Sequence, residues 1–302
     1  MQTMLSISEH DLAATLAVAC ARHHCESIDT WIETKEQNME KLVADTAEIT
    51  DLEQQFDVLD RNGYLLVRGA LNLEMVEAWR ECLTRKYNHE EWDISNEVGN
   101  VAFDHLLEQE PDLARPLVGH ASVAPYLKAM LGRQCQLRSF RAHINPAAYT
   151  QEWHKDFGYY WDAPGEARHA LRPLCINTTF YLTDNTPETG RLTFIDDFCH
   201  NALPEEIRHL GGYNSDNPFY QWCEKQPHTH LYPMTGDAVV FFSHIPHQGA
   251  KLRQENDGEP LRCNVVLHYQ QTPMFPGIPF VSSPLPAIEA LGYNGTFPFI
   301  DQ

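Results

Sequence analysis

Residues 151–160, Gln-Glu-Trp-His-Lys-Asp-Phe-Gly-Tyr-Tyr, contain the pattern on which our prediction of the fold depends. His154 and Asp156 are two residues apart, and residues i and i+2 of an extended strand project from the same face. An imidazole and a carboxylate therefore point together into the space that this face encloses. With one distant histidine they would form a 2-His-1-carboxylate triad, which suits non-haem Fe(II) because three coordination positions stay open.

Three later segments alternate polar and apolar side chains, as half-buried strands do. They cover residues 136–144, 174–183 and 261–270. Their polar faces contain the following candidate site residues: Arg141, His143, Asn177, Thr179, Arg262, Asn264 and His268. Their apolar faces suit packing beneath helices. Two interpretations stay open at this point, polar faces that line a cavity and polar faces that are simply solvated.

A further strand is predicted over residues 238–243, directly after Gly236-Asp237. It leads into a segment with two histidines, His244 and His247. A histidine at the far end of this strand is the expected third ligand, and position alone does not choose between the two. Arg262 follows His247 by fifteen residues and begins the next strand on its polar face.

Composition restricts the class of partner. The 302 residues include 22 Lys and Arg against 42 Asp and Glu, a net charge of −20 with no basic run. Such a field repels phosphate backbones and acidic membranes, so we expect a small-molecule substrate and no nucleic acid or membrane partner. Eight cysteines without a Cys-x-x-Cys pair, and no apolar N-terminal segment, indicate a cytoplasmic protein with reduced thiols.

The chain divides into two parts. Residues 1–52 are predicted to form a helical N-terminal extension, and residues 53–302 a β domain that starts with a strand over 64–67 and helices over 73–87 and 123–131. Within this domain we expect an insertion or lid over 197–233, rich in aromatic residues, and a Pro-rich tail over 271–302. Any homo-oligomer contact is expected to involve the N-terminal helices or this tail.

With these motifs, residues 56–270 resemble the phytanoyl-CoA dioxygenase family of Fe(II)- and 2-oxoglutarate-dependent oxygenases. The most specific segments are Trp153-His154-Lys155-Asp156, residues 180–192, and Gly236-Asp237 followed by His247. The resemblance implies a mainly β fold with flanking helices, built on a double-stranded β-helix core of the jelly-roll or cupin-like type. It also selects His247 over His244, so that His154, Asp156 and His247 become the expected metal ligands and catalytic residues.

The resemblance also implies where 2-oxoglutarate binds. Arg262 stands at the position of the family's arginine, which pairs with the distal carboxylate of this co-substrate. Asn264 replaces the serine that related enzymes often have two residues after the arginine, and residues 254–259 lengthen the preceding loop. Further candidates for the co-substrate are Thr179, Asn177 and Arg141, and those for the substrate are Tyr159, Tyr160, Trp161, His143 and His268.

The implied reaction is hydroxylation of an unactivated C–H bond of a small molecule, with consumption of O2 and release of succinate and CO2. Asp156 argues against halogenation, because halogenases of the family have a small residue in place of the carboxylate. Two other functions stay open. One is a cupin-like, metal-dependent isomerase or hydrolase without 2-oxoglutarate, and the other is a non-catalytic relative that binds a small molecule.

Overall fold

The structure is a computed structural model of the chain. It describes residues 51–95, 100–104, 106–131, 135–145, 151–156, 175–187, 189–196, 203–208, 210, 216–249 and 262–271. All of these belong to the unit Thr46–Gln302. The predicted helical extension, apart from residues 51 and 52, and the Pro-rich tail after Gln271 lie outside the described residues.

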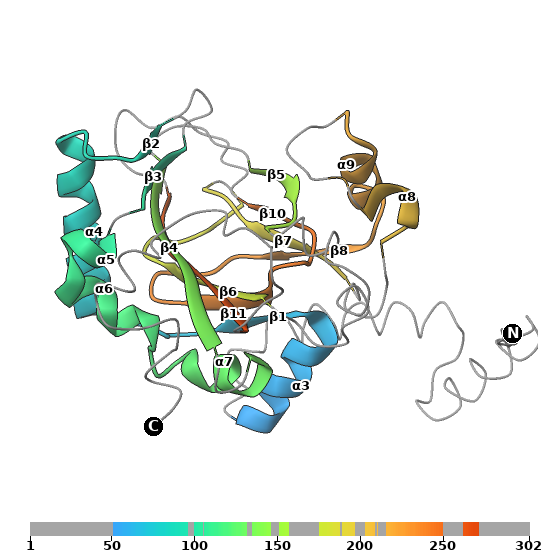
Figure 1. Cartoon of the computed structure of the whole chain (residues 1–302), viewed down its shortest axis with the longest axis horizontal. Coiled ribbons are helices and arrows are strands. Elements are labelled where there is room, and N and C mark those ends of the chain that lie inside the picture. Colours follow the sequence, from blue (N-terminus) through green and yellow to red (C-terminus); the bar gives the residue numbers. More distant parts are fainter. Residues whose placement is uncertain are drawn as a thin grey trace, which may run out of the picture. The chain divides into compact units, whose positions relative to one another are not determined.

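Two antiparallel sheets form the core of the fold (Figure 1). The larger sheet has the strand order β1 (Tyr64–Val67), β9 (Ala238–Phe242), β6 (Cys175–Tyr181), β11 (Arg262–Gln271), β4 (Cys135–Asn145), β3 (Val101–Phe103) and β2 (Ile94–Ser95). The smaller sheet has the order β5 (Gln151–His154), β10 (His247–Gly249), β7 (Leu192–Ile195) and β8 (His228–Leu231). The three strands predicted from alternation and the strand predicted over 238–243 are confirmed, and they lie side by side in the order β9, β6, β11 and β4.

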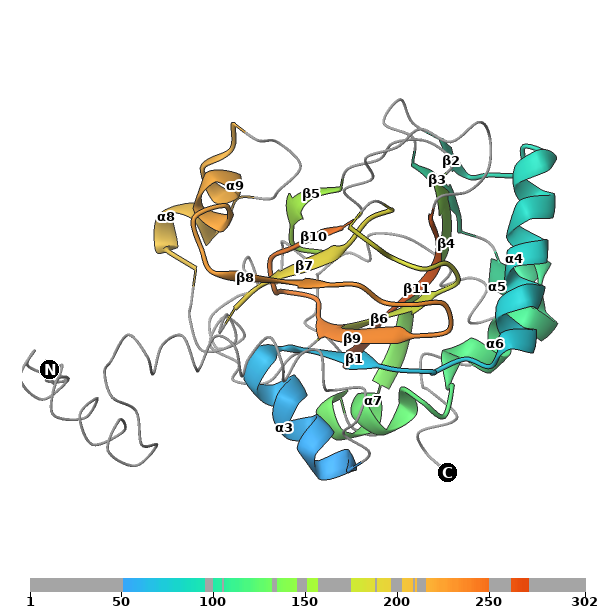
Figure 2. The same ribbon diagram turned by 180° about the vertical axis from the view of Figure 1, so that it is seen from behind.

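Helices cover the outer face of the larger sheet, as Figure 2 shows from behind. They are α3 (Leu52–Asn62), α4 (Leu73–Asn88), α5 (Leu106–Gln109), α6 (Pro111–Val118) and α7 (Ala124–Leu131). Trp79 of α4 stacks on Phe140 of β4 with ring centroids 5.9 Å apart, and the Tyr269 hydroxyl of β11 donates to the carbonyl of Val118 at 2.9 Å. The apolar strand faces therefore pack beneath helices, as predicted. No helix in the described part of the chain is long and apolar enough to cross a lipid bilayer.

Aromatic rings fill part of the space between the two sheets. Tyr64 of β1 stacks on Phe194 of β7 with centroids 4.4 Å apart and an interplanar angle of 10°. Phe241 of β9 meets Phe194 edge to face at 5.2 Å and also packs against His247 at 4.9 Å. Because such pairs bury a large apolar area, they hold the two sheets together beside the histidine.

The Gly236-Asp237 pair lies at the start of β9 and is bonded to the residues that follow β1. The buried Asp237 carboxylate accepts hydrogen bonds from Arg68 Nη1 at 2.6 Å, the Gly69 amide at 2.9 Å and the Met234 amide at 2.7 Å. Gly236 has φ +87°, and a Cβ there would lie 2.9 Å from the carbonyl oxygen of Leu71. The motif thus has a structural role here, joining the start of β9 to the end of β1.

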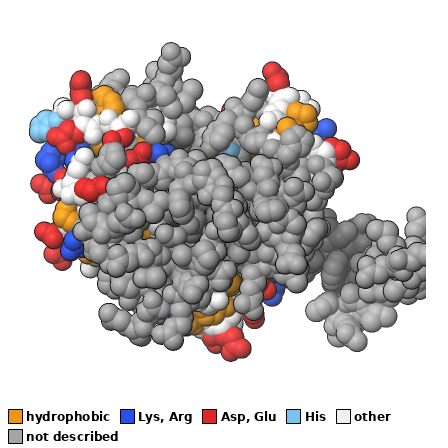
Figure 3. All heavy atoms as spheres, in the orientation of Figure 1, with side chains coloured by type: hydrophobic (Ala, Val, Ile, Leu, Met, Phe, Trp, Pro, Cys, Tyr) orange, Lys and Arg blue, Asp and Glu red, His pale blue; other side chains and the backbone are white. Residues whose placement is uncertain are grey.

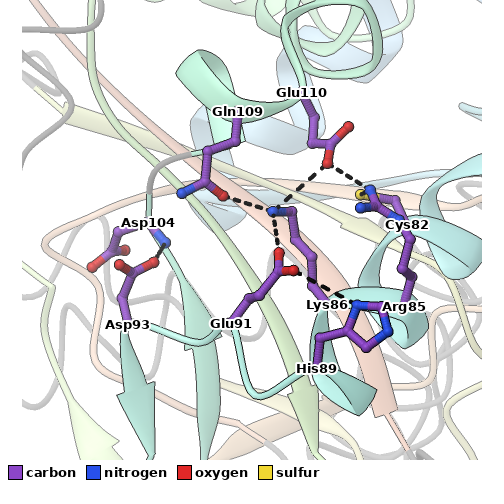
Figure 4. A network of polar contacts seen from close by, with 9 residues as sticks. All are labelled: Cys82, Arg85, Lys86, His89, Glu91, Asp93, Asp104, Gln109 and Glu110. Carbon is purple, nitrogen blue, oxygen red and sulfur yellow. Dashed lines mark hydrogen bonds and ion pairs between the residues drawn. The ribbon is translucent and has the colours of Figure 1, made fainter.

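A polar network beside α4 involves α5 and the ends of three other elements that were not predicted, namely β2, β3 and α6 (Figure 4). Lys86 of α4 is buried, with Nζ 3.1 Å from Glu91 Oε2, 2.7 Å from Gln109 Oε1 and 3.6 Å from Glu110 Oε1. These bonds join α4 to α5 and to the segment before β2, where Figure 3 shows charged side chains of both signs on the surface. In the same network the Asp93 carboxylate accepts from the Asp104 amide at 2.6 Å, which fixes the chain after β3.

The described part of the predicted insertion is more regular than expected. It contains α8 (Glu205–Arg208), α9 (Pro218–Cys223) and β8, and the pairing of β8 with β7 makes residues 228–231 part of the smaller sheet. Helix α9 packs on β5 and the residue after it. Trp153 Nε1 donates to Glu224 Oε1 at 2.6 Å, and Lys155 Nζ lies 5.1 Å from the centre of the Phe219 ring. Alternation over only four residues was too short to predict β8.

We expect Asp237→Ala to lower the free energy of unfolding by about 2–3 kcal/mol, because it removes a buried carboxylate that accepts three hydrogen bonds. Urea unfolding at neutral pH measures this change. Asp60→Ala, at an exposed position of α3, is the control and should stay within about 0.5 kcal/mol of the unchanged protein. Equal effects of the two substitutions would contradict the structural role of Asp237.

Candidate metal centre

The pairing of β5 with β10 brings two histidines together from positions 93 residues apart. His154 ends β5, His247 begins β10, and the two are direct partners in the antiparallel register. Their ring centroids lie 4.2 Å apart. His247 follows the predicted 238–243 strand but does not belong to it. A turn after Phe242 carries the chain from the larger sheet to the smaller one, and His247 is the first residue there.

Asp156 completes the cluster. One ligand atom from each of His154, Asp156 and His247 lies within 4.8 Å of the others. His154 Nε2 is 3.5 Å from Asp156 Oδ1, and His247 Nε2 is 3.4 Å from Asp156 Oδ2. Both rings are buried, whereas the carboxylate is 17% exposed and so faces the open side of the site.

Backbone carbonyls fix the tautomer of both imidazoles. Nδ1 of His154 lies 2.7 Å from the carbonyl oxygen of Glu152, and Nδ1 of His247 lies 2.9 Å from that of Ile245. Because a carbonyl only accepts, each Nδ1 must carry a hydrogen, and in the neutral imidazole each Nε2 then keeps the lone pair. Metal-binding histidines in proteins are held in this way, with the second nitrogen donating to a carbonyl or carboxylate.

A second layer of hydrogen bonds holds the Asp156 carboxylate. Asn177 Nδ2 of β6 donates to Asp156 Oδ2, and Ser243 Oγ donates to Asn177 Oδ1 at 2.5 Å. The Asp156 amide donates to the carbonyl of Ser243 at 3.2 Å. Asn177 and Ser243 are fully buried. The orientation of the carboxylate is thus set by both sheets and by the turn after β9.

The charge states suit metal binding. Burial, together with the neighbouring His154, lowers the pKa of His247 from 6.5 to about 4, so this imidazole is neutral at pH 7. Burial alone would raise the pKa of Asp156, but the surrounding imidazoles of His247, His154 and His268 outweigh it and hold that pKa well below 3.8. Two imidazoles and one carboxylate are a donor set typical of Fe(II) with open positions.

Arg262 lies buried on the inner face at the start of β11. In the amide orientation that satisfies its hydrogen bonds, Asn264 Oδ1 accepts from Arg262 Nε and Nη2, both at 3.1 Å. None of the ion pairs among the described residues includes Arg262. A Cβ added to Gly249 would lie 3.6 Å from Arg262 Nη1, so the glycine leaves room beside the guanidinium.

The other predicted site residues on the inner face do not all lie beside the triad. His268 Nε2 lies 3.7 Å from Asp156 Oδ2, beside the triad. His143 faces Asn264 across β4 and β11, and burial lowers its pKa to about 3. Thr179 is buried on β6 opposite Val266, two residues along the strand from Asn177.

Arg141 forms two hydrogen bonds to the Asp104 carboxylate, at 2.5 and 2.8 Å, so its charge is already paired. Tyr159, Tyr160 and Trp161 lie outside the described residues.

Several residues of the site were not predicted. Ser243 acts through Asn177, and Gly249 adjoins Arg262. Gln151 Nε2 lies 3.1 Å from His154 Nε2, although strand alternation would send the two side chains to opposite faces. The register between β5 and β10 shifts between His247 and Gly249, and such a bulge redirects side chains. Only the paired strand reveals a bulge, so the sequence of β5 alone contained no signal for Gln151.

Comparison with known proteins gives a family and a fold. The model of the family "Phytanoyl-CoA dioxygenase (PhyH)" matches residues 59–253. Comparison with curated protein sequences gives no match.

Among solved structures, the non-haem α-ketoglutarate-dependent epimerase SnoN from nogalamycin biosynthesis is similar with a TM-score of 0.57 and 19% identity, covering 78% of this chain and 92% of that one. HygX from Streptomyces hygroscopicus, with nickel, 2-oxoglutarate and hygromycin B bound, has a TM-score of 0.55 and 16% identity, covering 74% and 89%. EctD from S. alaskensis, with 2-oxoglutarate and 5-hydroxyectoine, has a TM-score of 0.54 and 19% identity, covering 73% and 76%. At these identities the likeness concerns the fold, and it confirms the expected double-stranded β-helix.

We expect Asn177→Ala to weaken Mn(II) binding about tenfold or more, because the Asp156 carboxylate loses the donor that orients it. Isothermal titration of the metal-free protein measures the affinity. Thr178→Val is the matched control on the same strand. Its side chain belongs to the opposite face, and its hydroxyl has no hydrogen-bond partner among the described residues. Equal affinity in the two variants would argue against the role assigned to Asn177.

The lowered pKa of His247 also predicts a pH dependence of stability. Between pH 6.5 and about 4 the unfolded chain binds a proton at this residue and the folded chain does not, so stability falls as the pH falls. The slope for one such histidine is about 1.4 kcal/mol per pH unit. We expect His247→Gln to make the decline between pH 7 and pH 5 shallower in urea unfolding of the metal-free protein. An unchanged slope would show that His247 does not titrate in this way.

Proposed function

The chain belongs to the phytanoyl-CoA dioxygenase (PhyH) family, and from this we propose that it is an Fe(II)- and 2-oxoglutarate-dependent oxygenase that hydroxylates an unactivated C–H bond of a small molecule. One observation supports this proposal above all others. The cluster of His154, Asp156 and His247 lies beside His268, on the face of β11 that also carries Arg262, a buried cation without a carboxylate among its described neighbours.

The residues of the cluster fit iron. Nε2 of His154, Nε2 of His247 and a carboxylate oxygen of Asp156 are the proposed ligands, and the two carbonyl-bound Nδ1 atoms keep the rings in place. Three protein ligands leave positions for the co-substrate and oxygen. Asn177 holds one carboxylate oxygen and thereby sets the orientation in which Asp156 meets the metal.

The inner face also fits 2-oxoglutarate. An isolated buried charge is costly, and an anionic ligand offsets that cost when it binds. The planar guanidinium of Arg262 suits a carboxylate. Asn264 accepts hydrogen bonds from its Nε and Nη2 atoms, and the other N–H groups point elsewhere. In this proposal Arg262 binds the distal carboxylate of 2-oxoglutarate, while Thr179 and Asn264 border the same ligand. Arg141 is not needed for this charge, because Asp104 already balances it.

The balanced reaction takes R–H, O2 and 2-oxoglutarate to R–OH, succinate and CO2. When bound, the iron supplies the oxidising chemistry by which one oxygen atom reaches the substrate and the other reaches succinate. The protein binds and orients the reactants and keeps bulk water from the buried imidazoles. His143 and His268 lie on the inner face near the triad and are the proposed polar contacts for the substrate, together with Tyr159, Tyr160 and Trp161.

Hydroxylation is the outcome we propose, but enzymes of this fold have others. The similar structures include an epimerase and a carbocyclase, SnoK, next to proteins with hygromycin B or 5-hydroxyectoine bound. A small molecule is therefore the proposed substrate here as well. The mass of the product separates the outcomes, since hydroxylation adds one oxygen, epimerisation leaves the mass unchanged and ring closure by oxidation removes two hydrogens.

In the described part of the chain, four cysteines are buried free thiols, namely Cys82, Cys175, Cys223 and Cys263. Free thiols are typical of a reducing compartment, so we propose a cytoplasmic location. The expected oligomer contacts, through residues 1–52 or 271–302, stay predictions because almost all of these residues lie outside the described part.

The test is anaerobic addition of Fe(II) and then 2-oxoglutarate to the metal-free protein, followed by visible spectroscopy. We expect the weak charge-transfer band of a keto acid on ferrous iron. Asp156→Ala should abolish it, because the metal loses its only carboxylate ligand. Arg262→Ala should keep iron binding but weaken 2-oxoglutarate binding about a hundredfold or more, because a buried charge pair is lost. Arg115→Ala, exposed on α6, is the control and should leave both affinities unchanged.

Each contrary outcome favours one of the other functions. Iron that binds without giving the band would favour the cupin-like isomerase or hydrolase, in which Arg262 has no co-substrate to hold. A protein that binds no Fe(II) would favour the non-catalytic relative.

A further inference from the structure

Strand β5 and the two residues after it carry two of the three proposed metal ligands, yet backbone pairing holds this stretch weakly. The strand has four residues, lies at the edge of the smaller sheet, and shifts its register with β10 between His247 and Gly249. Its other edge pairs with no strand in the described part of the chain. A short edge strand with a bulge is poorly fixed by its ladder alone. The direction of His154 and Asp156 therefore depends on contacts made by side chains.

Helix α9 of the insertion lies beside β5 in both views of the fold (Figures 1 and 2), and it contacts the residues on either side of His154. Trp153 Nε1 donates to Glu224 Oε1 at 2.6 Å, and Trp153 is 1% exposed, whereas Glu224 is exposed. Lys155 Nζ lies 5.1 Å from the centre of the Phe219 ring, and both residues are buried. Both contacts come from the face of the strand that points away from the proposed metal.

A third contact involves the residue whose carbonyl orients His154. The Tyr220 side chain of α9 lies beside the carboxylates of Glu152 and Glu224, and burial together with hydrogen bonding to these groups raises the pKa of Tyr220 well above 10. The phenol therefore stays protonated and acts as a donor next to the two carboxylates. The backbone carbonyl of Glu152 lies 2.7 Å from Nδ1 of His154. Three residues around this ligand, at positions 152, 153 and 155, are thus all in contact with the insertion.

We propose that Glu224 and Tyr220 are positioning residues for the metal site. Neither is a proposed ligand. They hold Trp153 and Glu152, and thereby fix the backbone from which His154 is directed. This inference rests on the proposed function, in which His154 binds the metal. Removing the Glu224 carboxylate would leave the buried indole N–H without an acceptor, and β5 would shift because that loss is costly.

A double-mutant cycle on the affinity for Mn(II), measured by isothermal titration, tests the bond between Trp153 and Glu224. We expect Glu224→Ala and Trp153→Phe each to weaken Mn(II) binding about 3- to 10-fold, because either change breaks the same hydrogen bond. The double variant should bind no more weakly than the weaker single variant, since the bond can be lost only once. Tyr220→Phe, which removes only the hydroxyl, should weaken Mn(II) binding by a factor of about 2 to 5.

A conservative variant separates the effect of charge from that of position. Glu224→Ala removes a negative charge as well as an acceptor, and either loss weakens the binding of a cation. Glu224→Gln removes the charge but keeps a carbonyl oxygen for Trp153 Nε1. Because the charge at this exposed position is screened, we expect Glu224→Gln to bind Mn(II) within about twofold of the unchanged protein. Glu206→Ala, which removes an exposed carboxylate from α8 of the same insertion, is the matched control and should leave the affinity unchanged.

A spectroscopic measurement distinguishes positioning from general damage to the fold. The d–d absorption of Co(II) bound at the site reports the arrangement of its ligands. We expect Glu224→Ala to change this absorption and Glu224→Gln to leave it unchanged. A residue that only stabilises the fold would lower the free energy of unfolding in urea without altering the Co(II) spectrum or the Mn(II) affinity of the folded protein.

The outcomes also separate this inference from the proposed function. If the unchanged protein binds no Mn(II), the proposed ligands are wrong, and the proposed function fails with them. If it binds Mn(II) but Glu224→Ala leaves the affinity and the Co(II) spectrum unchanged, or Glu224→Gln does not restore them, the positioning role alone is wrong. Additive effects in the double-mutant cycle would contradict that role as well. Weaker binding in the alanine variant, rescue by glutamine and a non-additive cycle together support it.

Discussion

The antiparallel pairing of β5 with β10 is the contact from which the site is built. It places His154 directly opposite His247, and strand geometry then brings Asp156 to the same opening. The aromatic rings of Phe194 and Phe241 pack against His247 from two different sheets, so the ring has little freedom to turn. Backbone carbonyls complete the arrangement by fixing both tautomers. A metal ion would thus meet ligands that are already oriented, and binding would cost little conformational entropy.

Two arginines on the inner face differ in whether a carboxylate among the described residues balances their charge. Arg141 and Arg262 both project from the larger sheet toward the space between the sheets. Arg141 has a carboxylate partner, Asp104, which the Asp93 side chain holds by its backbone amide. Arg262 is more deeply buried, and the neighbours described for its guanidinium are the neutral amide of Asn264 and the Tyr181 ring, whose centre lies 5.9 Å away. A paired charge contributes to the wall of the cavity, whereas an unpaired buried one attracts an anion.

Much of the fold followed from local patterns, because alternation with period two identifies which face of a strand is buried. This predicted β4, β6 and β11 and the division of their faces, whereas β9 was predicted from the continuous apolar run after Gly236-Asp237. The residues around the triad were harder to predict. Asn177 was found as an inner-face residue, but its bond to Asp156 depends on how the two sheets pack, because β6 belongs to the larger sheet and β5 to the smaller one. The Asp104 partner of Arg141 lies 37 residues away on a segment whose short strands left no periodic signal. Contacts set by tertiary packing are not written in any one window of the sequence.

Alternate residues of β5 and of the two positions after it face two different neighbours. His154 and Asp156 face the proposed metal, while Trp153 and Lys155 face α9 through Glu224 and Phe219. Because the two sets alternate along the chain, inserting or deleting a single residue between them would exchange their directions, placing the ligands under the helix and the tryptophan in the cavity. Sequence change in this stretch is therefore confined to substitutions, and the spacing of the metal motif is held constant.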